Sequence, residues 1–158
     1  MTESEKKRIE SMLRDWGRAH DVIAAAARDE REYRLKYGDR LLVIKGAGES
    51  IRRDSQLNEY RRGIVEAQNT AAEFAKITRK INDVLRVLPK REVNLIYALY
   101  RNGLTVRCAG ELMGYSERQT YNIKAEMLEM VRRALRDNSK KRAVGDALDE
   151  AAESSEKK

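Results

Sequence analysis

The chain has 158 residues and a formal net charge of +7, with 37% charged and 6% aromatic residues. Its single cysteine excludes an intramolecular disulfide framework, and one proline with nine glycines favours helical structure. No apolar run reaches the roughly 18 to 20 residues that a membrane span requires, and the acidic start lacks the apolar core of a signal peptide. We therefore expect an all-α cytoplasmic protein with no membrane partner.

Residues 3 to 37 are predicted to form one long helix. Apolar residues recur there at steps of three and four, which places them on one helical face. Gly38 suits the end of this helix, and the glycine-containing stretch 38–50 breaks the periodicity. We expect a loop in that stretch.

A second long helix is predicted for residues 52 to 87. Its apolar residues recur at a spacing close to that of a heptad repeat, which is typical of a coiled-coil seam. Neither apolar face can stay in water, so residues 1–88 are expected to form an antiparallel hairpin, or to pair with a second copy as a homo-oligomer through these N-terminal helices. A purely structural coiled coil would show the same pattern.

Pro89 marks a boundary, because a proline disfavours helix in the residue before it and suits the first turn of the next helix. Residues 89 to 142 carry 12 basic and 6 acidic side chains, the densest positive excess of the chain. A basic segment of this kind favours a polyanionic partner such as DNA, since neutralised phosphates release counterions. Beyond Asp137 the periodicity is lost, and we expect a disordered charged tail at 138–158.

The pattern of residues 103 to 135 indicates a helix-turn-helix. Thr105 can cap a short helix, and Gly114 offers the left-handed conformation of a tight turn. Ser116 can cap a longer helix that runs to about Leu135. A short helix, a glycine turn and a longer helix form the DNA-binding motif whose second helix enters the major groove.

The helix that starts at Glu117 would present its first two turns to the base edges. Arginine can bond guanine bidentately, glutamine and asparagine can bond adenine, and tyrosine can contact the thymine methyl group. The expected base-reading residues are Arg118, Gln119, Tyr121 and Asn122. The expected phosphate-binding residues are Thr105, Arg107, Ser116, Lys124, Arg132 and Arg133.

Residues 88 to about 136 also carry landmarks at fixed positions, namely Leu88-Pro89-Lys90-Arg91-Glu92, Gly103-Leu104-Thr105 and Met113-Gly114-Tyr115-Ser116. With these landmarks the segment resembles region four of bacterial sigma factors. Because a basic helical half precedes it, the whole chain is similar to small phage and prophage late transcription regulators of the ArpU and RinA type. The resemblance implies a regulator of phage or prophage genes at the nucleoid of a bacterial host cell, with RNA polymerase as a further partner.

One stretch departs from that family. Where region four has Glu-Ile-Ala, this chain has Cys108-Ala109-Gly110, so we expect thinner packing in the first helix of the motif. Leu112 and Met113 are expected to face inward, and Cys108 to be a small buried residue.

Together these patterns predict a long, coiled-coil-like antiparallel helical hairpin followed by a C-terminal helix-turn-helix domain at 89–137. The expected function is sequence-specific binding of double-stranded DNA in transcription regulation. We expect no catalytic, cofactor or metal site, because His20 stands alone and no carboxylate pair lies in an apolar pocket. Two alternatives would use the same elements: the small subunit of a phage terminase that recognises a packaging site, and a protein interaction module that binds RNA polymerase.

Overall fold

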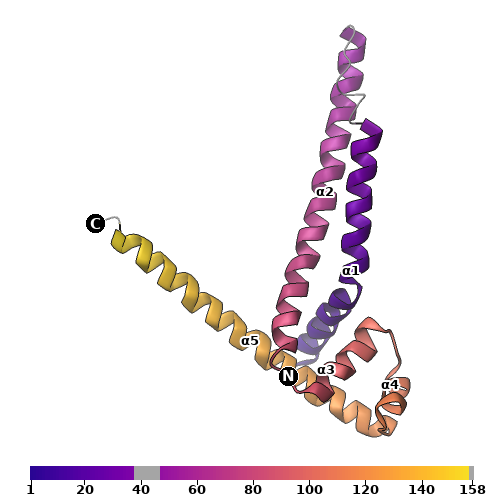
Figure 1. Cartoon of the computed structure of the whole chain (residues 1–158), viewed down its shortest axis with the longest axis vertical. Coiled ribbons are helices and arrows are strands. Elements are labelled where there is room, and N and C mark those ends of the chain that lie inside the picture. The colour runs from indigo at the N-terminus through magenta and orange to yellow at the C-terminus, as the bar shows by residue number, and fades with distance from the viewer. Residues whose placement is uncertain (38–46, 157–158) are drawn as a thin grey trace. The chain divides into compact units, whose positions relative to one another are not determined.

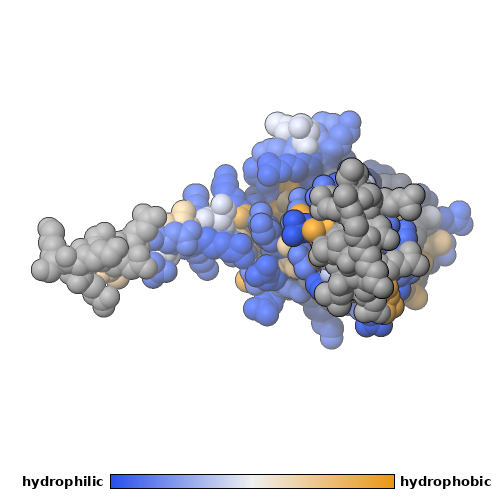
Figure 2. Space-filling model, turned by 90° about the horizontal axis from the view of Figure 1, so that it is seen from above, coloured by the Kyte–Doolittle hydropathy of each residue, from blue (hydrophilic) through white to orange (hydrophobic). Residues whose placement is uncertain are grey.

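The computed structural model describes residues 1–37 and 47–156, and every regular element within them is helical (Figure 1). The predicted all-α class is confirmed. Most of the coloured side chains in Figure 2 are hydrophilic, which accords with a mean hydropathy of −0.74. The helices are α1 (Glu3–Tyr37), α2 (Ala47–Leu85), α3 (Lys90–Ile96), the π-helix η2 (Tyr97–Arg101) that continues α3, α4 (Val106–Met113) and α5 (Glu117–Glu156).

The chain divides into two compact units that each include part of α1 and part of α2. Unit 1 comprises residues 1–17 and 79–158, and unit 2 comprises residues 18–78. The sequence places a boundary at Pro89, whereas the last turns of α2 belong to the same unit as α3, α4 and α5. The observed unit therefore extends beyond the predicted boundary at Pro89. It also includes the first half of α1, whose apolar side chains are buried there.

The core of unit 1 draws its side chains from α1, α2, α3 and α5. Trp16 of α1 donates its indole N–H to Asn82 Oδ1 at 3.1 Å, and its ring meets that of Tyr97 edge-on, with centroids 5.1 Å apart. Burial of each large apolar side chain stabilises such a core by about 1.5 to 3 kcal/mol. The other buried apolar side chains of these helices in unit 1 include Ile9, Leu13, Ile81, Val84, Leu95, Ile96, Met127, Leu128 and Val131.

Gly17 lets α1 approach η2 closely. A Cβ atom at this position would lie 1.9 Å from the carbonyl oxygen of Tyr100, which is far inside van der Waals contact. Because the obstacle is backbone rather than the end of a flexible side chain, any larger residue must push the two helices apart. About four turns into α1, the helix is thereby held close to η2, which precedes α4.

Arg91 of α3 connects a buried carboxylate of its own helix to α5. Glu92 is 1% exposed and accepts a hydrogen bond from Arg91 Nε at 2.8 Å. Arg91 also reaches Glu126 of α5, with Nη2 3.3 Å from Oε2. The charged residues that follow Pro89 therefore connect two helices of unit 1.

In unit 2 the two long helices run side by side in opposite directions. Gln68 of α2 donates a hydrogen bond to Glu30 of α1 at 3.3 Å, and the rings of Tyr37 and Tyr60 meet with centroids 6.4 Å apart. Later residues of α1 thus contact earlier residues of α2. The buried apolar side chains of this unit include Ala19, Ala26, Tyr37, Ile64 and Ala67.

The second long helix begins earlier than the sequence predicts. α2 starts at Ala47, within the stretch 38–50 that was expected to be a loop. Residues 38–46 of that expected loop lie outside the described residues.

The last helix also extends further than the sequence predicts. α5 continues to Glu156, although the periodicity favours a helix end near Leu135 and a disordered tail at 138–158. The tail is rich in alanine, lysine and glutamate and contains no proline, so its residues favour helix even where the apolar periodicity is weak.

We expect Gly17→Ala to lower the free energy of unfolding by about 1 to 3 kcal/mol, because its methyl group would overlap the carbonyl of Tyr100. Gly145→Ala on α5 is the matched control. Nothing lies within 4 Å of its Cβ position, and alanine should stabilise the helix by about 0.5 to 1 kcal/mol. Urea denaturation followed by far-UV circular dichroism and by the fluorescence of Trp16 measures both. Equal effects of the two substitutions would contradict the close approach of α1 and η2.

Candidate nucleic-acid interface

The start and end of α4 are set by two residues with special roles. The Thr105 hydroxyl accepts a hydrogen bond from the amide of Cys108 at 3.2 Å, which satisfies one free donor of the first turn. Gly114 ends the helix in the left-handed conformation, with φ of 78°. The predicted cap at Thr105 and the predicted turn at Gly114 are confirmed. The Thr105 hydroxyl is therefore already engaged with the helix backbone.

A capping box begins α5. The amide of Gln119 donates to Ser116 Oγ at 3.3 Å, and the amide and hydroxyl of Ser116 each donate to Gln119 Oε1 at 3.0 Å. The predicted cap at Ser116 is confirmed, but it uses the side chain of Gln119, which was expected to read a base. Only the amide nitrogen of Gln119 could then contact a base while the cap persists.

Gly110 allows α4 and α5 to pack closely. A Cβ atom here would lie 2.2 Å from Thr120 Oγ1, and Thr120 is 1% exposed. The Thr120 hydroxyl donates to the carbonyl of Ser116 at 2.8 Å, so its position is fixed. The expectation of thinner packing at Gly110 is wrong, because the missing side chain is what admits Thr120 of the next helix.

The outward face of the first two turns of α5 carries three polar side chains. Arg118, Tyr121 and Asn122 are three and four residues apart, so they lie on one side of the helix, and all three are exposed. Tyr121 keeps 53% of its surface exposed although its ring is largely apolar. We call these residues the reading stripe.

Two residues of α4 lie differently from the prediction. Leu112 is 74% exposed and Cys108 is exposed, although both were expected on the inner side. The inner face of this short helix is formed by Ala109 and Gly110, which are buried, so positions 108 and 112 fall on the outer face.

Two expected phosphate-binding residues face α1 instead. Lys124 Nζ lies 2.7 Å from Glu10 Oε1, and only 22% of the lysine side chain is exposed. Burial raises the pKa of Glu10, but the hydrogen bond and charge of Lys124, with the charges of Arg14 and Lys6, outweigh it, so the pKa lies below its ordinary value. Arg132 donates to Glu129 at 2.7 Å and lies 3.9 Å from Glu5 of α1. These cations stabilise the packing of α1 on α5.

Two other expected phosphate-binding residues remain open to solvent. Arg107 on α4 is 72% exposed and pairs with Glu111 at 3.1 Å, one helical turn along. Arg133 on α5 is 68% exposed and pairs with Glu129 at 3.2 Å. Water screens exposed pairs of this kind, so a phosphate can compete for either guanidinium.

Sequence reasoning missed a second group of cations. Arg8, Lys80 and Arg136 line a groove of about 480 Å³ in unit 1. They come from α1, α2 and α5, so nothing in their sequence spacing indicates that they meet.

Within the described part of the chain, no cluster of three or more His, Cys, Asp and Glu side chains could hold a metal ion, and no helix is long and apolar enough to cross a membrane. No protein-family model, curated protein or solved structure matches this chain.

We expect Glu129 to titrate with a pKa of about 2, because Arg132 and Arg133 donate hydrogen bonds to its carboxylate. This pKa lies below the ordinary 4.5, so the interaction favours the folded state above pH 4.5 and is lost as the pH falls through about 2. NMR titration of the glutamate carboxyl carbons measures it. Arg132→Gln with Arg133→Gln should return the pKa toward 4.5, and a wild-type titration already near 4.5 would contradict the pairing.

Proposed function

We propose that this chain is a sequence-specific regulator of transcription that binds double-stranded DNA through a helix-turn-helix formed by α4 and the start of α5. The observation that carries the proposal is the reading stripe of Arg118, Tyr121 and Asn122. These side chains belong to the first two turns of α5, and the close approach of Gly110 to Thr120 packs those turns against α4.

The proposed docking follows from the geometry of a helix end. A recognition helix enters the major groove with its N-terminal turns first, so the reading stripe would meet the base edges. Arg118 would bond guanine, Asn122 would bond adenine and Tyr121 would contact a thymine methyl group or a phosphate. Gln119 would contribute only its amide nitrogen, because its oxygen caps α5.

The proposed phosphate contacts come from the cations that remain exposed. Arg107 at the first turn of α4 and Arg133 on α5 are free to exchange a carboxylate partner for a phosphate. We assign Lys124 and Arg132 to the packing of α1 on α5. The excess of 12 basic over 6 acidic residues in 89–142 supports the proposal, since it supplies the long-range attraction of a polyanion.

The remaining parts of the proposal rest on the resemblance to phage regulators. The paired helices of unit 2 would form the hairpin arm that contacts a second copy of the chain or RNA polymerase. The regulated genes would be phage or prophage genes in a bacterial host. A terminase small subunit would need the same DNA-reading elements, and would be recognised by ring-shaped oligomers in solution.

Selection of bound duplexes from a random pool, at about 150 mM salt, tests the proposal, because counterion release alone then gives little affinity. We expect an enriched sequence that is lost from the selection with Arg118→Ala and Asn122→Ala. Each lost bidentate contact should weaken binding by about 1 to 3 kcal/mol. Arg61→Ala, an exposed arginine of unit 2, is the matched control and should leave the enrichment unchanged.

Two results would oppose the proposal. Binding that vanishes with salt and enriches no sequence would leave only non-specific attraction. Absence of DNA binding by the intact chain would favour the protein interaction module.

A pair of substitutions at Gln119 separates its structural role from its proposed role at the DNA. Gln119→Glu keeps the capping box, since glutamate serves equally at this position, but brings a carboxylate to the groove. We expect unchanged stability and DNA affinity reduced tenfold or more. Gln119→Ala should instead cost about 0.5 to 2 kcal/mol of stability through the weakened cap. Wild-type affinity in Gln119→Glu would show that this turn does not face DNA.

A further inference from the structure

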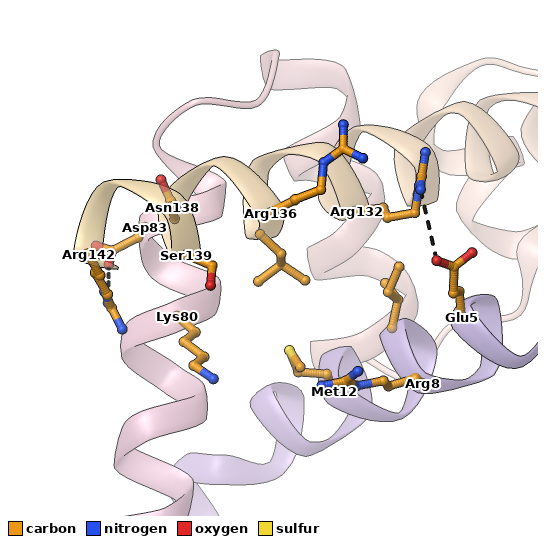
Figure 3. Close-up of a pocket in the computed structure, with 12 residues that line it drawn as sticks. Glu5, Arg8, Met12, Lys80, Asp83, Arg132, Arg136, Asn138, Ser139 and Arg142 are labelled. Carbon is orange, nitrogen blue, oxygen red and sulfur yellow. Dashed lines mark hydrogen bonds and ion pairs between the residues drawn. The ribbon is translucent and has the colours of Figure 1, made fainter. Parts of the chain in front are cut away.

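The groove of about 480 Å³ in unit 1 lies between the start of α1, the end of α2 and the middle of α5 (Figure 3). Met12 from α1, Lys80 from α2 and Ser139 from α5 point into the same space. Ile9 and Leu135 add apolar surface to the lining. The groove therefore combines an apolar interior with a charged rim.

The charges of the rim do not cancel. Glu5 pairs with Arg132 at 3.9 Å, and Asp83 pairs with Arg142 at 3.1 Å, so both acidic residues of the lining already have a cation. The lining also contains Arg8, Lys80 and Arg136, and no ion pair joins these three to any described residue. The groove thus offers three positive charges around an apolar interior.

The end of α5 has the complementary character. Val144, Ala147 and Leu148 lie at steps of three and four on one helical face, and Val144 and Leu148 are 60% and 65% exposed. Asp149 is exposed at the flank of this face, whereas Asp146 is exposed on the opposite side of the helix. Residues 143–158 carry five acidic and two basic side chains, the reverse of the charge balance in the rest of the chain. We call residues 143–156 the α5 end.

We propose that the α5 end of a second copy of this chain docks in the groove. Val144 and Leu148 of that copy would bury their side chains against Met12 and Leu135, while its Asp149 carboxylate would reach the cations of the rim. Removal of exposed apolar surface from water drives the association, and the opposite charges fix the orientation. Each copy places its α5 end in the groove of the other. The two contacts are therefore identical and related by a two-fold axis.

The chain cannot fill its own groove in this way. α5 is continuous from Glu117 to Glu156, and Arg142 lies at the rim, where it pairs with Asp83. Leu148 is six residues further along, which places it about 9 Å beyond Arg142 along the helix axis. A helix that keeps its direction carries the α5 end away from the groove, so a second copy is required.

A pair of charge reversals tests the proposal in the full-length chain. The groove variant carries Arg8→Glu and Arg136→Glu, and the end variant carries Asp149→Lys. Each variant alone places like charges at both contacts of its dimer, so we expect association about tenfold weaker than in the wild type. Mixed together, the two variants pair opposite charges at both contacts. The mixture should therefore form a heterodimer with close to wild-type affinity.

Sedimentation equilibrium measures these associations, and circular dichroism checks that each variant is folded. Asp146→Lys, on the side of α5 opposite Val144 and Leu148, is the matched control for the end variant and should change the association little. The proposal is overturned by a wild type that stays monomeric, by variants that associate as the wild type does, or by a mixture that is not rescued.

Disulfide formation locates the contact independently of any pairing in unit 2. In a Cys108→Ser background, one chain carries Ala147→Cys and the other carries Ser139→Cys. We expect a disulfide-linked heterodimer when the two chains are mixed and oxidised. Asn69→Cys, at an exposed position of unit 2, replaces Ser139→Cys in the control and should give no link. Equal yields of the disulfide-linked heterodimer in the two mixtures would show that the α5 end has no preferred binding site.

Discussion

The close packing of the first half of α1 within unit 1 is the constraint on which the rest of that unit depends. Gly17 has no side chain where the Tyr100 carbonyl passes, and Trp16 beside it bonds Asn82 and packs against Tyr97. The start of the chain thus becomes part of the support for helices far away in the sequence. Its effect extends to α5, where Lys124 is held by a carboxylate of α1.

This constraint divides the surface of α5 between different tasks. The side of the helix that meets α1 uses Lys124 and Arg132 in ion pairs, so these cations serve packing. The first two turns carry the reading stripe, and the capping box fixes where those turns begin. Further along, the same helix borders the basic groove and then ends in an acidic segment. One helix could therefore connect DNA reading with dimer formation.

Local chemistry could be predicted from the sequence, whereas contacts between distant segments could not. Thr105, Gly114 and Ser116 act within one helical turn of their partners, so their roles follow from residue type and spacing. The partner of Lys124 lies on α1, and no pattern within residues 103 to 135 indicates it. The packing at Gly110 was predicted wrongly for the same reason, because the space left by its missing side chain is filled by Thr120 of the next helix. The length of α5 was underestimated because helix propensity persists where the apolar periodicity fades.

The most direct test of the proposed function is NMR of the side-chain N–H groups of Arg118 and Asn122, with and without a duplex selected by the chain. The account predicts that both signals shift on binding at about 150 mM salt, because the two groups would exchange water for base edges. The N–H signal of Trp16, buried in the core of unit 1, should stay in place as the internal reference. Binding that leaves the Arg118 and Asn122 signals unmoved, while signals of unit 2 shift, would contradict the assignment of the reading stripe to DNA.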